Sequence, residues 1–384
     1  MKNQRAFILF LILFLSFTIY LYYQSKPNDE TIVLGASLPL SGMNKELGSE
    51  VALGANIWFN YINSRGGING QKIRFIAYDD KYEPQNTSHN LKKLLEKDKA
   101  FALFGFVGTP TIKKIYPSIV SNKIPLVASY TGAAFLRDEK EPYIVNFRTS
   151  YQSEIDAIVE HLYLNQNLTK FAIFYQNDVY GEEGYIATVN ALEKRDLTLQ
   201  GEGTYKRNTL SIHHALHEIA SVNPEAIIIV GAYKPSALFI KQARKEGLKD
   251  VIFCPISFVN SDALVNELDG KTENILFSQT APSYGNIENS AAKEYLNLLN
   301  DFKPNHPPTF ASYETFLAAK AFTKALSLIQ GRMTRAKLID VLSSQRKVDL
   351  GGINISFTPE HMHSKAYLFV NDSGFQAIHQ REFK

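Results

Sequence analysis

The segment Thr31–Leu38 reads TIVLGASL, an uncharged run rich in β-branched residues that predicts a buried strand. Apolar residues then recur at helical spacing through Glu50–Asn63, and Gly66-Gly67 ends the predicted helix. Lys72–Tyr78 (KIRFIAY) alternates between polar and apolar residues, as a second strand does. A strand, a helix and a strand in this order predict a right-handed βαβ unit in a parallel sheet.

The same alternation continues in two successive series. The first series adds helices at Ser88–Glu96 and Thr111–Val120 and strands at Phe101–Phe106 and Leu126–Ala128. The second begins near Tyr151, with helices at Ser153–Leu164, Gly184–Glu193, Ser211–Ser221 and Ser236–Glu246 and strands at Phe171–Tyr175, Leu197–Thr204, Ala226–Val230 and Val251–Cys254. We therefore predict an α/β chain with two doubly wound parallel-sheet lobes of similar size.

The last part of the chain contributes to both lobes. It shows helices at Tyr313–Ile329 and Arg335–Leu342, paired strands at Ile353–Phe357 and Ala366–Val370, and a turn at 371–374 that leads to a hairpin strand, Phe375–Ile378. No low-complexity linker separates the series, so we expect interleaved lobes joined by several crossings. The predicted lobes are residues 31–147 with 280–349, and residues 148–279 with 350–384.

Residues 1–26 form a membrane signal. Lys2 and Arg5 precede an apolar run, Ala6–Tyr23, which approaches the length of a membrane span. Basic residues before this run place the rest of the chain outside the cytoplasm. The run ends in tyrosines rather than in small residues, which favours an uncleaved anchor in the inner membrane through residues 6–23 over a cleaved signal peptide. A buried helix of the fold is the remaining interpretation.

Composition excludes several classes of protein. Hydrophobic residues make up 45% of the chain, enough for large cores, so a disordered or fibrous chain is excluded. The net charge of +3 equals the contribution of Lys2, Arg5 and Lys26, so the body is formally neutral and no nucleic-acid partner is expected. The single cysteine, Cys254, excludes an intrachain disulfide and a cysteine-based metal site.

A loop after a predicted strand is the best candidate site. Val107, Gly108, Thr109 and Pro110 lie between the strand at 101–106 and the start of a helix. Ligands of open α/β sheets bind beyond the carboxyl ends of the strands. Gly108 lets the backbone approach a ligand, Thr109 offers a hydroxyl, and the amides of a helix N-terminus favour a carboxylate. A simple helix cap is the alternative interpretation.

Metal and cofactor sites are not expected. His213, His214 and His217 place two imidazoles four residues apart, but no third ligand is near in the sequence, so we predict no metal. The chain has neither a dinucleotide-binding glycine pattern after the first strand nor a phosphate-binding loop with lysine, so we predict no cofactor and no enzyme activity. An α/β enzyme remains an alternative, because a missing motif does not disprove catalysis.

Seven segments, in order, resemble the branched-chain amino-acid-binding (leucine-binding) family of periplasmic receptors. They are GASLPLSG (35–42), GGINGQKIRFIAYDD (66–80), FGFVGTPT (104–111), IPLVASYTGA (124–133), YQNDVYGEEG (175–184), IIIVGAYKPSA (227–237) and KQARKEGL (241–248). The resemblance covers about residues 31 to 380. It implies the type I periplasmic-binding fold, in which two lobes joined by three crossings close on a small ligand.

The resemblance also implies binding residues. Thr109 would contact the ligand carboxylate, with Val107 and the backbone of the loop that holds Tyr130 and Gly132. Tyr180 and Tyr233 would face the cleft from the second lobe. The acidic residue that relatives use for an ammonium group falls at Ile256, beside Ser257, and two further family contacts are replaced by Gly132 and Leu47.

These departures leave the ligand class open. Isoleucine cannot pair with an ammonium group, so an α-amino acid is in doubt. Asp178 could supply the missing charge, and an apolar or aromatic carboxylate or a neutral amide fits as well. We expect an extracytoplasmic receptor that binds a small polar solute between its lobes for the permease of an ABC importer. A membrane-tethered sensing subunit for a signalling membrane protein is the alternative.

Overall fold

The computed structural model describes residue 16, residues 31–137 and residues 141–378. The predicted membrane segment, residues 6–23, lies outside the described residues except for Ser16. Within the described ranges, no helix has both the length and the apolar character that a membrane crossing requires.

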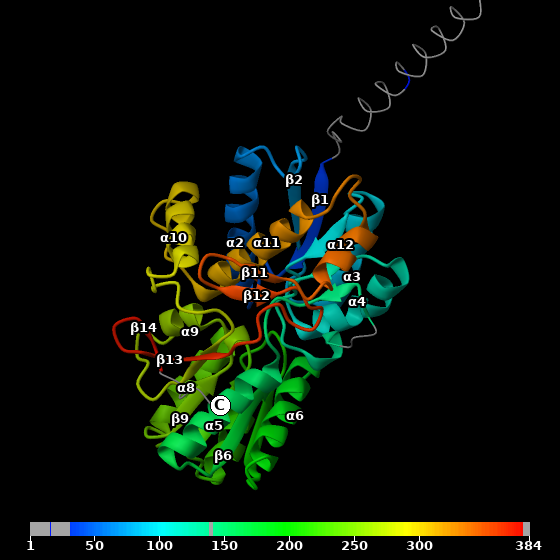
Figure 1. The fold of residues 1–384 in the computed structure, drawn as a ribbon. Helices are drawn as coiled ribbons and strands as arrows, with labels where there is room; N and C mark the ends of the chain where they lie inside the picture. Colours follow the sequence, from blue (N-terminus) through cyan, green and yellow to red (C-terminus); the bar gives the residue numbers. More distant parts are fainter. Residues whose placement is uncertain (1–15, 17–30, 138–140, 379–384) are drawn as a thin grey trace, which may run out of the picture.

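A five-stranded parallel sheet forms the upper half of the molecule in Figure 1, in the order β2-β1-β3-β4-β5. Its strands are β1 (Ile32–Leu38), β2 (Ile73–Asp79), β3 (Ala102–Phe104), β4 (Leu126–Val127) and β5 (Ile144–Val145). The helices of this half are α2 (Lys45–Ser64), α3 (Pro84–Glu96), α4 (Thr109–Asn122), α10 (Ser290–Phe302), α11 (Phe310–Ser327) and α12 (Arg335–Leu342). The opening βαβ unit is confirmed, because β1 pairs in parallel with β2 from Ile32 to Leu38.

A four-stranded parallel sheet forms the lower half, in the order β7-β6-β8-β9. Its strands are β6 (Phe171–Gln176), β7 (Leu199–Tyr205), β8 (Ala226–Val230) and β9 (Ile252–Pro255). The helices are α5 (Tyr151–Gln166), α6 (Val179–Glu193), α7 (His213–Ser221), α8 (Tyr233–Lys245) and α9 (Ser261–Glu267). Every residue of β8 is buried, as expected of a central strand covered by helices on both faces. The predicted α/β class with parallel sheets is confirmed.

The C-terminal strands pair differently from the prediction. Strand β12 (Asn354–Ser356) pairs with β11 (Lys347–Asp349), whereas β13 (Tyr367–Asn371) pairs with β10 (Phe277–Gln279) and β14 (Phe375–Ala377). The predicted pairing of 353–357 with 366–370 is therefore wrong. The physical reason is a turn we did not recognise: the Asp349 carboxylate accepts the amides of Gly351 and Gly352, which both have positive φ. The predicted hairpin across 371–374 is confirmed.

The chain passes between the two halves three times, through residues 146–150, 280–289 and 357–366. The lobe limits given above stay a prediction. The β11–β12 hairpin belongs to the same hydrophobic cluster as α2, α11 and α12, through Leu350, Ile353 and Ile355.

Helices α9 and α10 had no counterpart in the sequence-based prediction. In both, an asparagine side chain (Asn260 and Asn289) caps the first turn.

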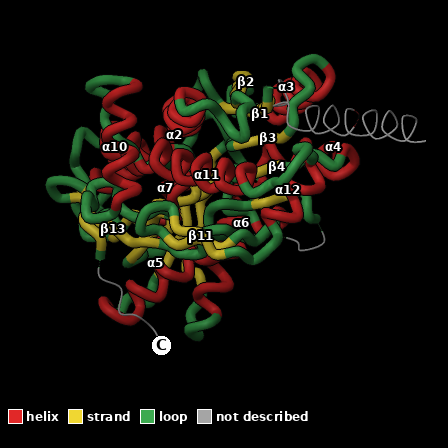
Figure 2. Tube along the Cα trace, turned by 45° about the horizontal axis from the view of Figure 1, so that its top comes forward, coloured by secondary structure: helices red, strands yellow, loops and turns green. Residues whose placement is uncertain are grey.

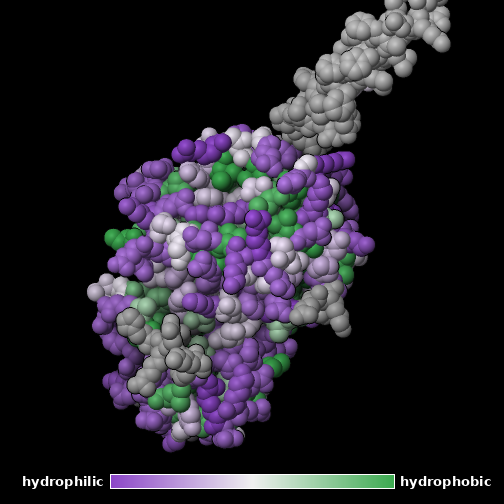
Figure 3. Space-filling view, in the orientation of Figure 1, coloured by the Kyte–Doolittle hydropathy of each residue, from purple (hydrophilic) through white to green (hydrophobic). Residues whose placement is uncertain are grey.

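The two halves are closed on each other. A single hydrophobic cluster joins Leu38, Leu47 and Val107 of the first half to Ile229 and Tyr180 of the second. Figure 2 shows α2 and α11 side by side in the first half, and hydrophilic residues prevail on the face shown in Figure 3. The apolar side chains of the interface are therefore hidden from water in this closed arrangement.

Candidate functional site

The N-terminus of α4 lies at the interface of the two halves. Gly108 is the N-cap residue, with φ near 103°, and no side chain caps the helix. A Cβ atom at Gly108 would lie 2.4 Å from a ring carbon of Tyr82, so only glycine fits between the ring and the helix start. Val107 and Tyr130 form an isolated parallel bridge, which holds the loops that follow β3 and β4 together. The first-turn amides of α4 therefore lack a side-chain acceptor.

Three hydroxyl groups meet beside this helix start. The Thr109 hydroxyl lies 2.8 Å from that of Thr131 and 3.4 Å from the phenol oxygen of Tyr151, and Thr131 lies 3.1 Å from Tyr151. All three residues are buried. Burial raises the pKa of Tyr151 to about 12, so its phenol keeps the proton at neutral pH. Hydroxyl donors beside an uncapped helix N-terminus can hold a carboxylate or a carbonyl oxygen.

Gly132 contacts this hydroxyl cluster through its backbone. Its carbonyl accepts the amide of Tyr151 at 2.9 Å, and a Cβ atom at this position would lie 2.5 Å from the Tyr151 ring. The tyrosine ring thus fills the space of a side chain at position 132. Sequence reasoning did not single out Tyr151, although its position at the start of α5, after the first crossing, was a usable signal.

An aromatic cluster spans the interface. The ring of Phe258, which follows β9, lies 4.6 Å from Tyr180, 6.2 Å from Tyr130 and 6.1 Å from Tyr82, measured between centroids. Tyr180 stands at the first turn of α6, where the Asp178 carboxylate accepts its amide. Its phenol donates to the carbonyl of Gly231, at 3.3 Å. Rings from both halves therefore come together: Tyr82 and Tyr130 from the first half, and Tyr180 and Phe258 from the second.

Ser257 lies in a buried network of charges next to these rings. Its amide and hydroxyl donate to the Glu154 carboxylate at 2.8 and 2.9 Å, and its hydroxyl also accepts from the Arg148 guanidinium. Arg148 pairs with Glu314 at 3.1 Å and lies 4.1 Å above the ring of Tyr130. Sequence reasoning missed this network, because Ser257 and Glu314 are each more than about 100 residues from Arg148 and Glu154 in the chain.

The network keeps its charge balance through Arg148. Burial alone would lower the pKa of Arg148, but the Glu314 carboxylate raises it above the ordinary value. Burial raises the pKa of Glu314, and Arg148 opposes that shift. The side chain of Arg148 is inaccessible to solvent. The guanidinium is therefore a fixed cation that joins the first crossing to the second, through Thr280, and to α11, through Glu314.

Tyr233 lines a cavity between the two halves, and no other predicted site residue lines it. The structure thus groups Val107, Thr109, Tyr130, Gly132 and Tyr180 with Ser257 nearby, and places Tyr233 at the outer end of the same interface.

Asp178, the candidate replacement acid, pairs with Arg207 at 3.0 Å, and Arg207 also pairs with Glu83 of the first half. Among the described residues, no group of histidine, cysteine or acidic side chains could hold a metal.

Asp80 supports the site from the end of β2, and its titration yields a test. The buried carboxylate accepts hydrogen bonds from the Ser37 and Thr87 hydroxyls and from the Tyr82 amide. Burial raises its pKa to about 6. Since the folded state then binds the proton more tightly than the unfolded state does, the free energy of unfolding should fall as pH rises from about 4 through 6. The loss would be up to about 3 kcal/mol.

Chemical denaturation at pH 4.5 and pH 7 measures this dependence. In Asp80→Asn, the decrease between the two pH values should be smaller than in the parent chain by most of that amount. Asp301→Asn, at an exposed position, should follow the parent chain. Equal pH dependence in the parent chain and Asp80→Asn would refute the role assigned to Asp80.

Comparisons with known proteins place the chain in a family. The model described as "Periplasmic binding protein" matches residues 31–373, and the chain therefore belongs to this family. Its fold is the type I periplasmic-binding fold of the leucine-binding proteins. Membership implies an extracytoplasmic location for the folded part of the chain.

Individual relatives are distant in sequence but close in structure. An "Amino acid binding protein" of Pseudomonas aeruginosa is 24% identical over 242 residues, which is 62% of each chain, so the match spans about three fifths of that relative. The crystal structure of a possible leucine/isoleucine/valine-binding protein from Rhodopirellula baltica has a TM-score of 0.86, is 28% identical, and covers 92% of this chain and 97% of its own. A substrate-binding periplasmic protein from Ralstonia solanacearum gives a TM-score of 0.82 at 26% identity, over 88% and 97%. These relatives are named as binding proteins.

Proposed function

We propose that this protein is a receptor without catalytic activity that binds a small polar solute, with a carboxylate or amide group, between its two lobes. The observation that carries the proposal is the hydroxyl cluster of Thr109, Thr131 and Tyr151 at the uncapped start of α4. The Tyr180 ring of the second half packs 5.4 Å from the Tyr151 ring of this cluster, and the Phe258 ring packs 4.6 Å from Tyr180. Closing the lobes would therefore bury a bound solute and exclude water from its hydrogen bonds.

Delivery to the permease of an ABC importer is the output that we favour. The family membership supports it, since relatives with this fold are substrate-binding proteins of the periplasm. A membrane-tethered sensing subunit is the second candidate, favoured by the apolar run at residues 6–23, which ends in tyrosines. The mass of the membrane-extracted protein, compared with that of the full-length chain, tests whether the run is retained.

Removing the Thr109 hydroxyl should weaken solute binding. A thermal-shift screen of the full-length chain against amino acids, aromatic acids, amides and polyamines would first find the solute class. We then expect Thr109→Val to lower the affinity by about 10- to 100-fold in calorimetry, because a hydrogen bond to a charged group contributes about 1.5 to 3 kcal/mol. The valine keeps the shape of the side chain and removes only the hydroxyl.

Thr169→Val is the matched control, since Thr169 is exposed in the loop before β6. Its affinity should equal that of the parent chain. The proposal fails if no solute shifts the unfolding midpoint, or if Thr109→Val binds the solute as tightly as the control does.

A further inference from the structure

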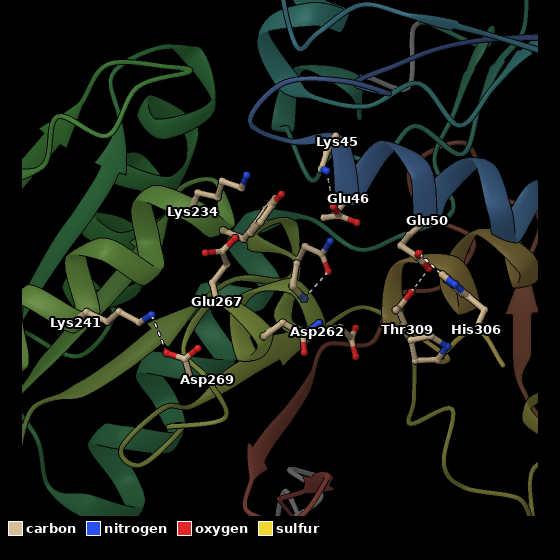
Figure 4. Close-up of a pocket in the computed structure, with 15 residues that line it drawn as sticks. Lys45, Glu46, Glu50, Lys234, Lys241, Asp262, Glu267, Asp269, His306 and Thr309 are labelled. Carbon is tan, nitrogen blue, oxygen red and sulfur yellow. Dashed lines mark hydrogen bonds and ion pairs between the residues drawn. The ribbon is translucent and has the colours of Figure 1, made fainter.

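A cavity of about 560 Å³ opens between the two halves at the outer end of the interface. One wall comes from the start of α2 and from residues 306–309, and the other from α8 and α9 (Figure 4). The volume is within the range of small-molecule sites. The Tyr180 phenol of the inner site donates to the carbonyl of Gly231, which precedes Tyr233 of the cavity wall by two residues.

Two carboxylates with little exposure to solvent lie in the cavity wall. Glu50 accepts hydrogen bonds from the His306 imidazole at 2.8 Å and the Thr309 hydroxyl at 2.7 Å. Asp262 accepts from the Phe310 amide at 2.8 Å and from the Tyr284 phenol at 2.9 Å. A carboxylate has about four acceptor positions, so each of these two groups keeps unused acceptor capacity.

The charges of the lining do not balance. Lys45 pairs with Glu46 and Lys241 with Asp269 at the exposed rim, which leaves Lys234 and Glu267 as charges of opposite sign. The surplus is therefore the pair Glu50 and Asp262. Among the basic side chains of the lining, His306 is the one that contacts this pair, at 2.8 Å from Glu50. Burial, with a smaller contribution from the Glu50 charge, raises the pKa of Asp262 to about 6. The two carboxylates thus repel each other in the absence of a cation.

Tyr233 provides an independent indication of a ligand. Its side chain lines the cavity, the residue is only 2% exposed, and no described residue forms a hydrogen bond of good geometry with its hydroxyl. Burial raises the pKa of this hydroxyl, and the charges of Glu46 and Glu267 raise it as well. The backbone amide of Glu46, in the other half, lowers it. A buried hydroxyl without a partner is costly unless a bound molecule supplies one.

We propose that this cavity binds the positively charged amino end of the solute, through Glu50, Asp262 and the Tyr233 hydroxyl. The inference rests on the proposed function, in which the start of α4 holds the carboxylate or amide end. It assigns the role of the acid missing at Ile256 to carboxylates on α2 and α9. The described residues offer no metal-binding group, so an organic ammonium is the cation that fits.

Calorimetry on the full-length chain with three series of solutes tests the proposal. The series are amino carboxylates from glycine to 6-aminohexanoate, the alkanoates of the same lengths, and the corresponding diamines. We expect one amino carboxylate to bind at least about tenfold more tightly than its alkanoate, because the amine gains charge-assisted hydrogen bonds. Asp262→Asn should lower the affinity for the amino carboxylate by about that factor and leave the affinity for the alkanoate unchanged.

Two variants separate binding from folding. Tyr233→Phe removes a hydroxyl that has no partner, so it should leave the unfolding midpoint unchanged or raise it, while lowering amino carboxylate affinity several-fold. Asp269→Asn, at the exposed rim, should bind as the parent chain does. If amino carboxylates and alkanoates bind with equal affinity, and Thr109→Val weakens the binding of both, the cavity assignment alone is overturned. Absence of any binding that depends on Thr109 would overturn the proposed function and the cavity assignment together.

Discussion

Arg148→Met is expected to lower the free energy of unfolding by about 3 to 5 kcal/mol, because it leaves buried carboxylates without their cation. Arg148 pairs with Glu314 at 3.1 Å and donates to the Thr280 hydroxyl at 3.1 Å, and its side chain is inaccessible to solvent. Methionine can fill much of the arginine volume, so the loss reports charge rather than a large cavity. Urea denaturation followed by tryptophan fluorescence and circular dichroism measures the change.

A second substitution shows whether the pair itself is responsible. Glu314→Gln in the Arg148→Met background should restore part of the lost stability, since it removes the unpaired charge. Arg65→Met, at an exposed position at the end of α2, should change stability by less than about 0.5 kcal/mol. If Arg148→Met costs no more than Arg65→Met, the buried network does not hold the crossings together.

Gly108→Ala is expected to cost about 3 to 5 kcal/mol and to abolish solute binding. The position has φ near 103°, where a side chain costs about 1 to 3 kcal/mol of strain. The new methyl group would also lie 2.4 Å from the buried Tyr82 ring, and such overpacking costs about 1 to 3 kcal/mol more. The displaced ring and the shifted start of α4 would alter the hydroxyl cluster.

Gly66→Ala is a matched control, because Gly66 also has φ near 103° but has no atom within 4 Å of an added Cβ. It should lose only the backbone part, about 1 to 3 kcal/mol, and should keep its affinity. The difference in unfolding free energy between the two variants then measures the contact with Tyr82. Equal losses in both variants would mean that the ring moves aside at no cost.

Local sequence signals were sufficient where neighbouring residues decide the structure. The uncharged strand at 31–38 and the glycine pair at 66–67 predicted the first βαβ unit, which the structure confirms. Gly108, Thr109 and Pro110 predicted a helix start at the end of a strand, and α4 begins at Thr109. The turn at 349–352 was missed, and the strand pairing of that region was wrong as a result.

The candidate site could be predicted only in part. Thr109, Tyr130 and Tyr180 come together at the interface, whereas Tyr233 lines the outer cavity. Tyr151, Arg148 and Glu154 were not found, because nothing near them in the sequence reveals what they contact. The sequence left the ligand class open because Ile256 replaces the acid that relatives use. Glu50 and Asp262 are far apart in the sequence and line a common cavity only in the folded chain.

The sequence by itself determined the alternation of strands and helices, the parallel sheets and the position of a glycine-containing helix start after a strand end. These follow from periodicity and from the conformational limits of glycine and proline, which act over a few residues. Only the tertiary structure decided that Arg148 meets Glu314, 166 residues away, and that Ser257 meets Glu154, 103 residues away. Such pairs form because a buried charge must find a partner wherever packing brings one, and packing depends on the whole chain.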